Sequence, residues 1–395
     1  MAGDQLARVA LTVLVYARTD SALLAAVTFV SSVIPMFIGG VLLGGLADRF
    51  PRRTVMIACD LLRCALVLLM IVPGVPVAVL VVLLFLVTLA SAPFTAARSA
   101  LMPDVLEGER YILGQTITMT TIQFAQVIGF GAGGAVAGFL GTRTSLVADA
   151  ATYALSAVIA VVWVRRRPSP RLEAGPAGGG GAGAGRGGFW SAAGYVFATP
   201  ALLLPMLFGW LSAFYNVPEG VAAPLAATLG GGATTVGVIL AAQMLGDVIG
   251  MLIIGRLVPP AARRRWMGPL AVGTCGVLAV FAVSPGTIGA LAVLVVSGVF
   301  GGYQLAASAE FVEALPQEVR GTAFGLAQGG MSLGQGIVII VAGAVADTVT
   351  PAMVIAVTGT GGAVCAVAVA VGWGRTRRAA EAGRKRLSPS SFPGA

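Results

Sequence analysis

The chain has 395 residues, of which 57% are hydrophobic and only 10% are charged, and its formal net charge is +9. A soluble protein of this length needs more charged surface, so the composition excludes that class and predicts an all-α polytopic membrane protein. The sequence contains no histidine, and its four cysteines have no paired spacing. These two features predict no disulfide framework, no metal site and no cofactor.

Apolar stretches of about 20 residues, the length that crosses a hydrocarbon core ~30 Å thick, recur along the whole chain. They predict twelve transmembrane helices in two groups of six. The approximate spans are 4–18, 21–46, 54–73, 76–98, 112–140, 144–164, 201–223, 234–256, 267–284, 286–307, 321–346 and 351–373. We expect residues 1–164 to form the first six-helix bundle and residues 201–374 to form the second.

The segment between the two bundles, residues 165–200, is predicted to be a flexible cytoplasmic linker. Its run Gly-Gly-Gly-Gly-Ala-Gly at 178–183 cannot bury a core. Aromatic residues at 189–197 predict a short interfacial helix at the end of the linker. The final segment, residues 375–395, is basic and then rich in Ser and Pro, which predicts a disordered tail.

The placement of the basic residues predicts the topology. Most of the 25 basic residues lie in every second loop or in the C-terminal tail, whereas the opposite loops hold only Arg18 and Arg143. Because cytoplasmic loops carry the excess of Lys and Arg, both termini are predicted to be cytoplasmic. This placement accounts for the positive net charge. It predicts that lipid headgroups are the partners of the basic residues and that nucleic acid is not. We expect a monomeric multi-pass protein of the cell membrane.

The first apolar segment, residues 6–16, is too short to cross a membrane. We expect the chain as given to lack about half of its first helix, roughly 10 residues. Asp4 and Arg8 are four residues apart, which is the spacing of a pair on one helix face. An intramembrane carboxylate is a functional candidate, so these two residues are expected either to bind a proton or substrate, or to form a static pair.

A charged loop separates the second and third spans, and residues 44–53 read Gly-Gly-Leu-Ala-Asp-Arg-Phe-Pro-Arg-Arg. The pattern Gly-x-Leu-Ala-Asp-Arg-x-x-Arg-Arg resembles the loop between helices 2 and 3 in the major facilitator superfamily, with Pro51 where members usually have Gly. Residues 250–265 resemble a degraded second copy, and residues 100–110 parallel residues 314–320. Such echoes fit two bundles related by an axis along the membrane normal.

This resemblance implies a conformational latch. In the superfamily, the Asp and Arg of this loop are thought to hold the cytoplasmic ends of the two bundles together in the outward-facing state. Asp48 and Arg49 would form the latch here, or these charges only set the topology. Asp60 and Arg63 are three residues apart and are expected to pair, either structurally or as an extension of the latch. The remaining residues of the expected latch are Arg52, Arg53, Arg98, Glu310 and Arg320.

The fifth span contains a glycine-rich stretch. Residues 129–134 read Gly-Phe-Gly-Ala-Gly-Gly and resemble the antiporter motif Gly-Pro-x-x-Gly-Gly of fifth helices, with Phe130 in place of Pro. That motif is associated with export. The alternative is that its small residues only let helices pack closely. The glycines concerned are Gly129, Gly133 and Gly134.

Further polar residues lie within the predicted spans. Asp149 in the sixth span is a second candidate for proton or substrate binding, and Glu219, near the outer end of the seventh, is a candidate for the mouth of the cavity. Several amides could line a polar cavity or only bond neighbouring helices. They are Gln123, Gln126, Asn216, Gln243 and Gln304.

The sequence contains no Gly-x-x-x-x-Gly-Lys-Ser/Thr loop, which excludes ATP-driven transport, and no arrangement of residues indicates an enzyme. The chain is similar to bacterial exporters of the enterobactin-exporter type and to multidrug efflux members of the superfamily. That similarity implies proton-driven export of a moderately hydrophobic small molecule, such as a drug, siderophore or secondary metabolite, by rocking of the two bundles. The alternatives are an uptake carrier or uniporter for a small nutrient, and a non-transporting membrane sensor on the same fold.

Overall fold

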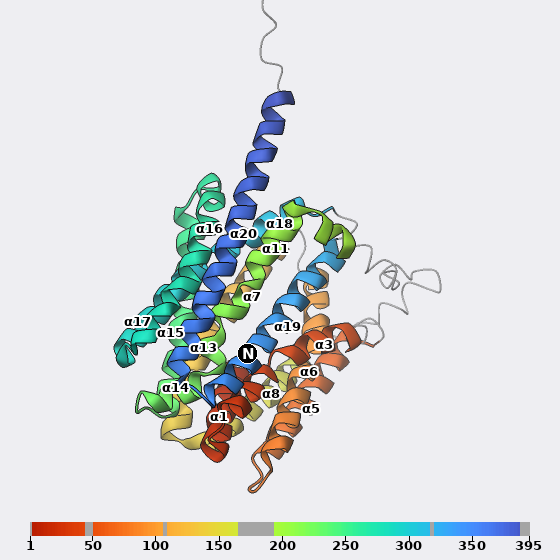
Figure 1. The fold of residues 1–395 in the computed structure, drawn as a ribbon. Helices are drawn as coiled ribbons and strands as arrows, with labels where there is room; N and C mark the ends of the chain where they lie inside the picture. Colours follow the sequence, from red (N-terminus) through yellow and green to blue (C-terminus); the bar gives the residue numbers. More distant parts are fainter. Residues whose placement is uncertain (1, 44–49, 106–108, 165–192, 317–319, 388–395) are drawn as a thin grey trace, which may run out of the picture.

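The computed structural model describes residues 2–43, 50–105, 109–164, 193–316 and 320–387, and every regular element in them is a helix (Figure 1). We call residues 2–164 the first half. Its helices are α1 (Ala2–Thr19), α2 (Ala22–Val30), α3 (Ile34–Leu43), α5 (Arg52–Met70), α6 (Val77–Val105), α7 (Glu109–Phe139) and α8 (Gly141–Trp163).

Residues 193–387 are called the second half. It begins with a helical turn at 193–198 and a broken span of four helices, α11 (Pro200–Trp210), α12 (Ser212–Tyr215), α13 (Val217–Gly220) and α14 (Ala222–Thr228). The next elements are α15 (Ala233–Leu252), the π-helix η1 (Ile253–Leu257), α16 (Pro260–Gly276) and the 3₁₀-helix η2 (Val277–Val283). The chain continues through α17 (Gly286–Gly301), α18 (Tyr303–Ala314), α19 (Arg320–Ala346) and α20 (Pro351–Leu387).

Nine segments of the described chain are long and apolar enough to cross a membrane, the first at 77–102 and the last at 351–378. They coincide with nine of the predicted spans. The other three predicted spans, 4–18, 21–46 and 54–73, correspond to α1, to α2 with α3, and to α5. Charged side chains interrupt the apolar run of α1, which contains Asp4, Arg8 and Arg18, and that of α5, which contains Asp60 and Arg63. The total of twelve spans, the sidedness and the division into two bundles stay predictions.

The span predicted at 21–46 is broken, because the structure places a turn at residues 31–33 between α2 and α3. Pro35 has no backbone N–H to donate to the preceding turn, which disfavours a continuous helix. The hydroxyl of Ser31 donates to the carbonyl of Val27 at 2.8 Å, and that of Ser32 donates to the carbonyl of Phe29 at 2.5 Å. Such side-chain bonds compete with the backbone ladder and bend helices.

The span predicted at 201–223 is also interrupted, at residues 211, 216 and 221. Pro218 and Pro224 remove two backbone donors there. Asn216 has a non-helical backbone with φ −89° and ψ 3°. This irregular backbone is mostly buried within the protein, where a membrane protein tolerates it because lipid does not reach its polar groups. Glu219, expected near the mouth, lies inside it and is buried.

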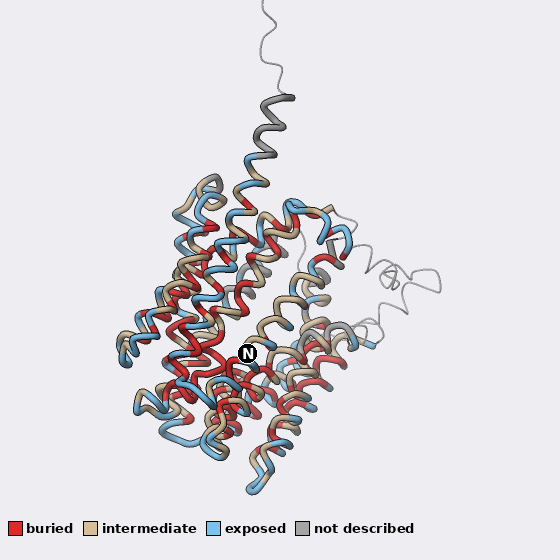
Figure 2. Tube along the Cα trace, in the orientation of Figure 1, coloured by how far each residue is buried: buried red, intermediate tan, exposed pale blue. Residues whose placement is uncertain are grey.

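Two pairs of helices make most of the contacts between the two halves. α7 packs along α15, and α2 packs against α19. A Cβ at Gly134 would lie 2.5 Å from the Cα of Gly237, so the first contact depends on glycine in both helices. Figure 2 shows that the buried residues concentrate in the middle of the molecule, where these helices meet.

The halves are also joined at one end, which we call the Asp20 end because it carries the α1–α2 loop. Asp347, just after α19, accepts hydrogen bonds from the backbone N–H groups of Ala22 at 2.5 Å and Leu23 at 3.3 Å, and from the hydroxyl of Ser21 at 3.0 Å. A carboxylate of the second half therefore caps the first turn of a first-half helix. We call the opposite end, which carries Phe50, the Phe50 end.

The last helix is longer than predicted. α20 continues to Leu387 and extends beyond the other helices in Figure 1, whereas the sequence predicts a disordered tail from residue 375. Residues 375–387 are rich in Arg and Ala, which are strong helix formers, and Ser and Pro dominate only after them. Residues 165–192, which contain most of the predicted linker, lie outside the described residues.

Candidate functional site

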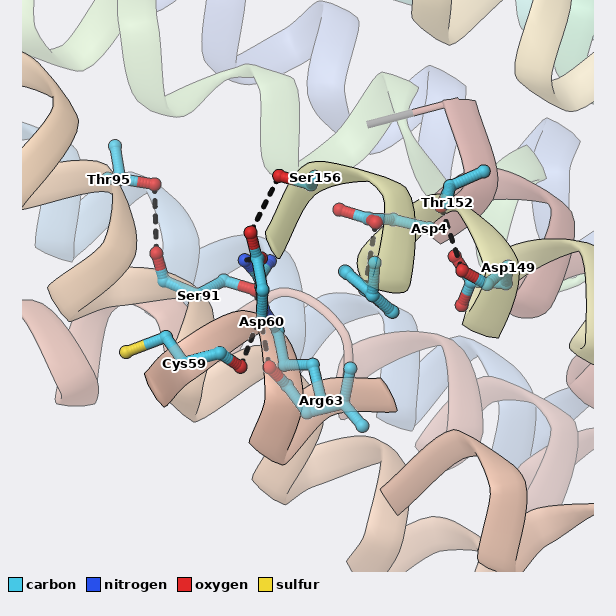
Figure 3. A network of polar contacts seen from close by, with 11 residues as sticks. Asp4, Cys59, Asp60, Arg63, Ser91, Thr95, Asp149, Thr152 and Ser156 are labelled. Carbon is cyan, nitrogen blue, oxygen red and sulfur yellow. Dashed lines mark hydrogen bonds and ion pairs between the residues drawn. The ribbon is translucent and has the colours of Figure 1, made fainter. Parts of the chain in front are cut away.

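A group of charged and hydroxyl side chains is buried in the first half where α1, α5 and α8 meet (Figure 3). α8 contributes Asp149, Tyr153 and Ser156, whose spacing of four and three residues places them on one helix face. α5 contributes Asp60 and Arg63 in the same way, and α1 contributes a further carboxylate. We call these residues the carboxyl cluster. Its members are Asp4, Asp60, Arg63, Asp149, Tyr153 and Ser156.

The pair predicted on α5 is present. Arg63 donates to the carboxylate of Asp60 in a buried ion pair, and Ser156 donates to the other oxygen of that carboxylate at 2.6 Å. The guanidinium also donates to the hydroxyl of Ser91 at 3.2 Å and lies 4.5 Å from the ring centre of Phe94. Burying both charges is tolerable because each is paired and hydrogen-bonded.

Asp4 and Arg8 contact different neighbours. The Tyr153 hydroxyl donates to Asp4 Oδ1 at 2.8 Å, which attaches α1 to α8. Arg8 donates to the carbonyl of Ser32 at 3.2 Å, and its guanidinium carbon lies 5.3 Å from the ring centre of Phe29. α1 therefore has one charge in the carboxyl cluster and one against α2.

Asp149 is the most isolated member of the carboxyl cluster. It is 1% exposed, and neither of its carboxylate oxygens has a hydrogen-bond partner among the described residues. The Asp4 carboxylate and the Arg63 guanidinium are both close enough to interact with it electrostatically. A Cβ at Gly3 would lie 2.3 Å from Asp149 Oδ1, so only glycine leaves room for this carboxylate against α1. An ionised carboxylate without hydrogen bonds is costly in such a site, and binding a proton removes that cost.

A second charged contact lies between the two halves. Glu219 in α13 is 5% exposed, and its Oε1 has no hydrogen-bond partner in the described chain. Arg8 of the first half is near enough for the two charges to attract each other. This is a cation and an anion on opposite sides of the interface between the halves.

Amide groups organise the interior of the second half. Gln243 donates from Nε2 to Asn216 Oδ1 and to the carbonyl of Tyr215, both at 3.1 Å. Gln304 donates to the Tyr215 hydroxyl at 2.8 Å and to the carbonyl of Gly209 at 3.2 Å. These bonds attach Gln243 and Gln304 to the broken span from α11 to α14.

The described members of the expected latch make contacts within their own halves. Arg52 donates to the carbonyl of Ala100 at 2.6 Å, and Arg53 donates to those of Ala160 at 3.2 Å and Val161 at 2.5 Å, near the end of α8. Arg98 is half-buried in α6. Asp48, Arg49 and the side chain of Arg320 lie outside the described residues, so the latch itself stays a prediction.

In the second half, Glu310 pairs with Arg264, which lies in the degraded second copy of the loop motif. The same guanidinium donates to Glu313 at 2.8 Å. This pairing joins the start of α16 to the end of α18 at the Phe50 end.

The glycine-rich stretch of α7 packs against two partners. A Cβ at Gly133 would lie 3.1 Å from the Cα of Leu6 in α1, while Gly134 faces α15. Gly129 is buried. Gln123 Nε2 lies 3.9 Å from the sulfur of Met251 in α15, and Gln126 is half-buried. The packing interpretation of these glycines is thus realised, whereas the association with export stays a prediction.

The sequence interpretation missed several residues of this interior. Tyr153 and Ser156 could have been found, because they lie four and seven residues after Asp149 on one face of α8. Tyr215 and Asp347 gave no local signal, because their partners are distant in the sequence. In the part of the chain that the structure describes, no group of His, Cys, Asp and Glu could hold a metal ion.

The helical fold, its apolar spans and its charged interior are those of a multi-pass membrane protein. The family model for the Major Facilitator Superfamily matches residues 1–221 and again residues 220–392. The chain therefore belongs to the Major Facilitator Superfamily.

Two solved structures illustrate the likeness. A mutant of the nucleoside transporter NupG superposes with a TM-score of 0.70 at 14% identity, covering 94% of this chain and 96% of that one. The POT family transporter PepTSo gives a TM-score of 0.67 at 15% identity, covering 96% of each chain. At such identities the likeness concerns the fold alone. No curated protein matches the chain.

Proposed function

We propose that the protein is a proton-coupled antiporter that exports a moderately hydrophobic small molecule through alternating access. The observation that carries this proposal is the carboxyl cluster, in which three carboxyl groups share the interior of a membrane-spanning half with one arginine. Ionisable groups inside a membrane are costly and mark ion or substrate pathways. Because the chain has no histidine, carboxyl groups are the side chains available to carry the proton.

We assign the transported proton to Asp149 together with Asp4. Two neighbouring carboxyl groups hold a proton jointly, because both cannot be ionised at low cost. Asp4 has a hydroxyl donor that stabilises its charge, whereas Asp149 has no hydrogen bond to its carboxylate among the described residues. Asp60 is less suited to proton transfer, because Arg63 and Ser156 already neutralise and satisfy it.

α1 provides the coupling between proton and conformation. It contacts the proton site through Asp4, and one turn later it faces Glu219 of the second half through Arg8. A change of charge at Asp4 alters the field at Arg8 and thus the attraction between the halves. Proton binding and rocking of the halves are then linked by a single helix.

The experiment is the efflux of a panel of uncharged and cationic dyes from energised cells that express the chain. We expect efflux to stop when a protonophore is added, and to fall at least about tenfold in Asp149→Asn, since a carboxamide cannot exchange a proton. Asp20→Asn is the matched control, because Asp20 is an exposed aspartate in the α1–α2 loop. Its efflux should equal that of the wild type.

Two outcomes would contradict the proposal. Accumulation of a compound inside the cells, driven by the proton gradient, would favour the uptake carrier. A correctly folded protein in the membrane that moves none of the dyes, nor a set of nucleosides and peptides, would favour the sensor.

A further inference from the structure

A pocket lies within the second half between α11, α18 and α19, toward the Phe50 end. Its walls come from residues that are distant in the sequence, including Met206 and Trp210 of α11, Phe311 of α18, and Phe324 and Met331 of α19. None of the residues that line it is charged. It is therefore separate in character from the carboxyl cluster of the first half.

The aromatic wall of this pocket is held rigidly. Trp210 Nε1 donates to the carbonyl of Ala327 at 2.9 Å, and a Cβ at Gly330 would lie 2.1 Å from Cζ2 of the indole. The Trp210 ring is thus pressed against the backbone of α19, and only glycine at 330 leaves room for it. Phe311 and Phe324 meet edge to face with their ring centres 5.9 Å apart. A ring fixed in the way of Trp210 loses little side-chain entropy when a ligand binds.

The polar groups of the pocket are few and neutral. Gln304 uses Nε2 to bond the Tyr215 hydroxyl and the Gly209 carbonyl, and its Oε1 remains available as an acceptor. Ser308 and Gln328 are exposed at the opening. A mostly apolar lining with a few placed polar groups is typical of small-molecule sites.

We propose that this pocket binds the aromatic part of an uncharged small molecule that offers a hydrogen-bond donor to Gln304. Aromatic side chains and two methionines favour flat, polarisable groups. The absence of a charged side chain in the lining leaves nothing to neutralise an ionic group, whose burial would be costly. This inference rests on the proposed export function, because it names the substrate class that the antiporter would carry.

The test is equilibrium binding of N-phenyl-1-naphthylamine, an uncharged fluorescent aromatic amine, to the purified full-length chain in lipid nanodiscs without a proton gradient. Phe324→Ala removes an exposed wall residue, and Ser308→Trp fills the opening. Each should weaken binding about tenfold, which is the loss expected for one well-packed aromatic contact and its buried area. Leu333→Ala is the matched control, because Leu333 lies outside the pocket on the same helix and, like Phe324, is 43% exposed. It should bind like the wild type.

Equal binding by all three variants would overturn the pocket, because the dye would then be held by the lipid-facing surface. Competition by the cation tetraphenylphosphonium at lower concentration than uncharged aromatics would overturn the substrate class. The two proposals also fail separately. Loss of binding in the pocket variants, without any proton-dependent efflux by the wild type, would support the pocket and reject the antiporter. Proton-dependent efflux that the pocket variants do not alter would support the antiporter and reject the pocket.

Discussion

The paired charges of α5 show how single residues keep this interior stable. Arg63 is buried against Phe94 and Tyr153 and is satisfied by Asp60 and Ser91. Removing one member of such a pair leaves the other as an uncompensated buried charge, which is worse than removing both. We therefore interpret Asp60 and Arg63 as a structural unit, and the proposed proton role falls to the less satisfied Asp149.

We predict that Arg63→Met lowers the stability of the folded protein by roughly 3–5 kcal/mol, whereas the double variant Asp60→Asn with Arg63→Met loses less than the single one. The measurement is the fraction of detergent-solubilised protein that stays monodisperse after heating. Arg143→Met is the control, because Arg143 is exposed at the start of α8. Losses that are equal for Arg63→Met and Arg143→Met would show that the buried pair contributes nothing.

At the scale of elements, the Asp20 end is closed by one carboxylate that caps a helix of the other half. Asp347 binds the first turn of α2 through two backbone N–H groups and one hydroxyl. In the alternating access that we propose, rocking of the halves breaks these bonds. We therefore expect Asp347 to contribute to the free-energy difference between the closed and open forms of this end.

We predict that Asp347→Ala shifts the equilibrium toward an open Asp20 end by about 1 kcal/mol, a roughly fivefold change in the ratio of the two forms. The measurement is a spin-label distance between Val72→Cys and Thr348→Cys in a background without native cysteines, since both positions are exposed. Asp347→Asn should change the distances much less, because Asn caps helices as well as Asp. An unaltered distance distribution in Asp347→Ala would rule out a contribution of Asp347 to this equilibrium.

The contact between α7 and α15 provides a second prediction for the elements. A Cβ at Gly134 would meet the Cα of Gly237 at 2.5 Å, where the neighbour is backbone and cannot turn aside. Gly134→Ala should therefore cost about 1–3 kcal/mol and reduce efflux. Gly325→Ala adds the same methyl group to α19, where nothing lies within 4 Å, and should be neutral or slightly stabilising. Equal behaviour of the two variants would contradict the packing shown.

At the scale of the whole molecule, the sequence was sufficient to predict the features that depend on local composition and spacing. Nine spans, the Asp60–Arg63 pair and the family follow from apolar length, spacing and one loop motif. The breaks at 31–33 and within 211–221 were missed, although Pro35 and Pro218 were visible, because the length of an apolar run says nothing about its continuity. The partners of Asp4 and Asp347 could not be predicted, because they depend on which helices pack together.

In the function that we propose, protons cross the membrane in one direction through a site in the first half, and the substrate crosses in the opposite direction. The measurement that tests it most directly uses proteoliposomes with a pH-sensitive dye inside and an imposed gradient of a compound that the cell assay identifies. The account predicts that substrate flow drives protons the opposite way in the wild type and that Asp149→Asn abolishes this proton movement. Substrate flow without proton movement in the wild type, or an undiminished proton signal in Asp149→Asn, would contradict it.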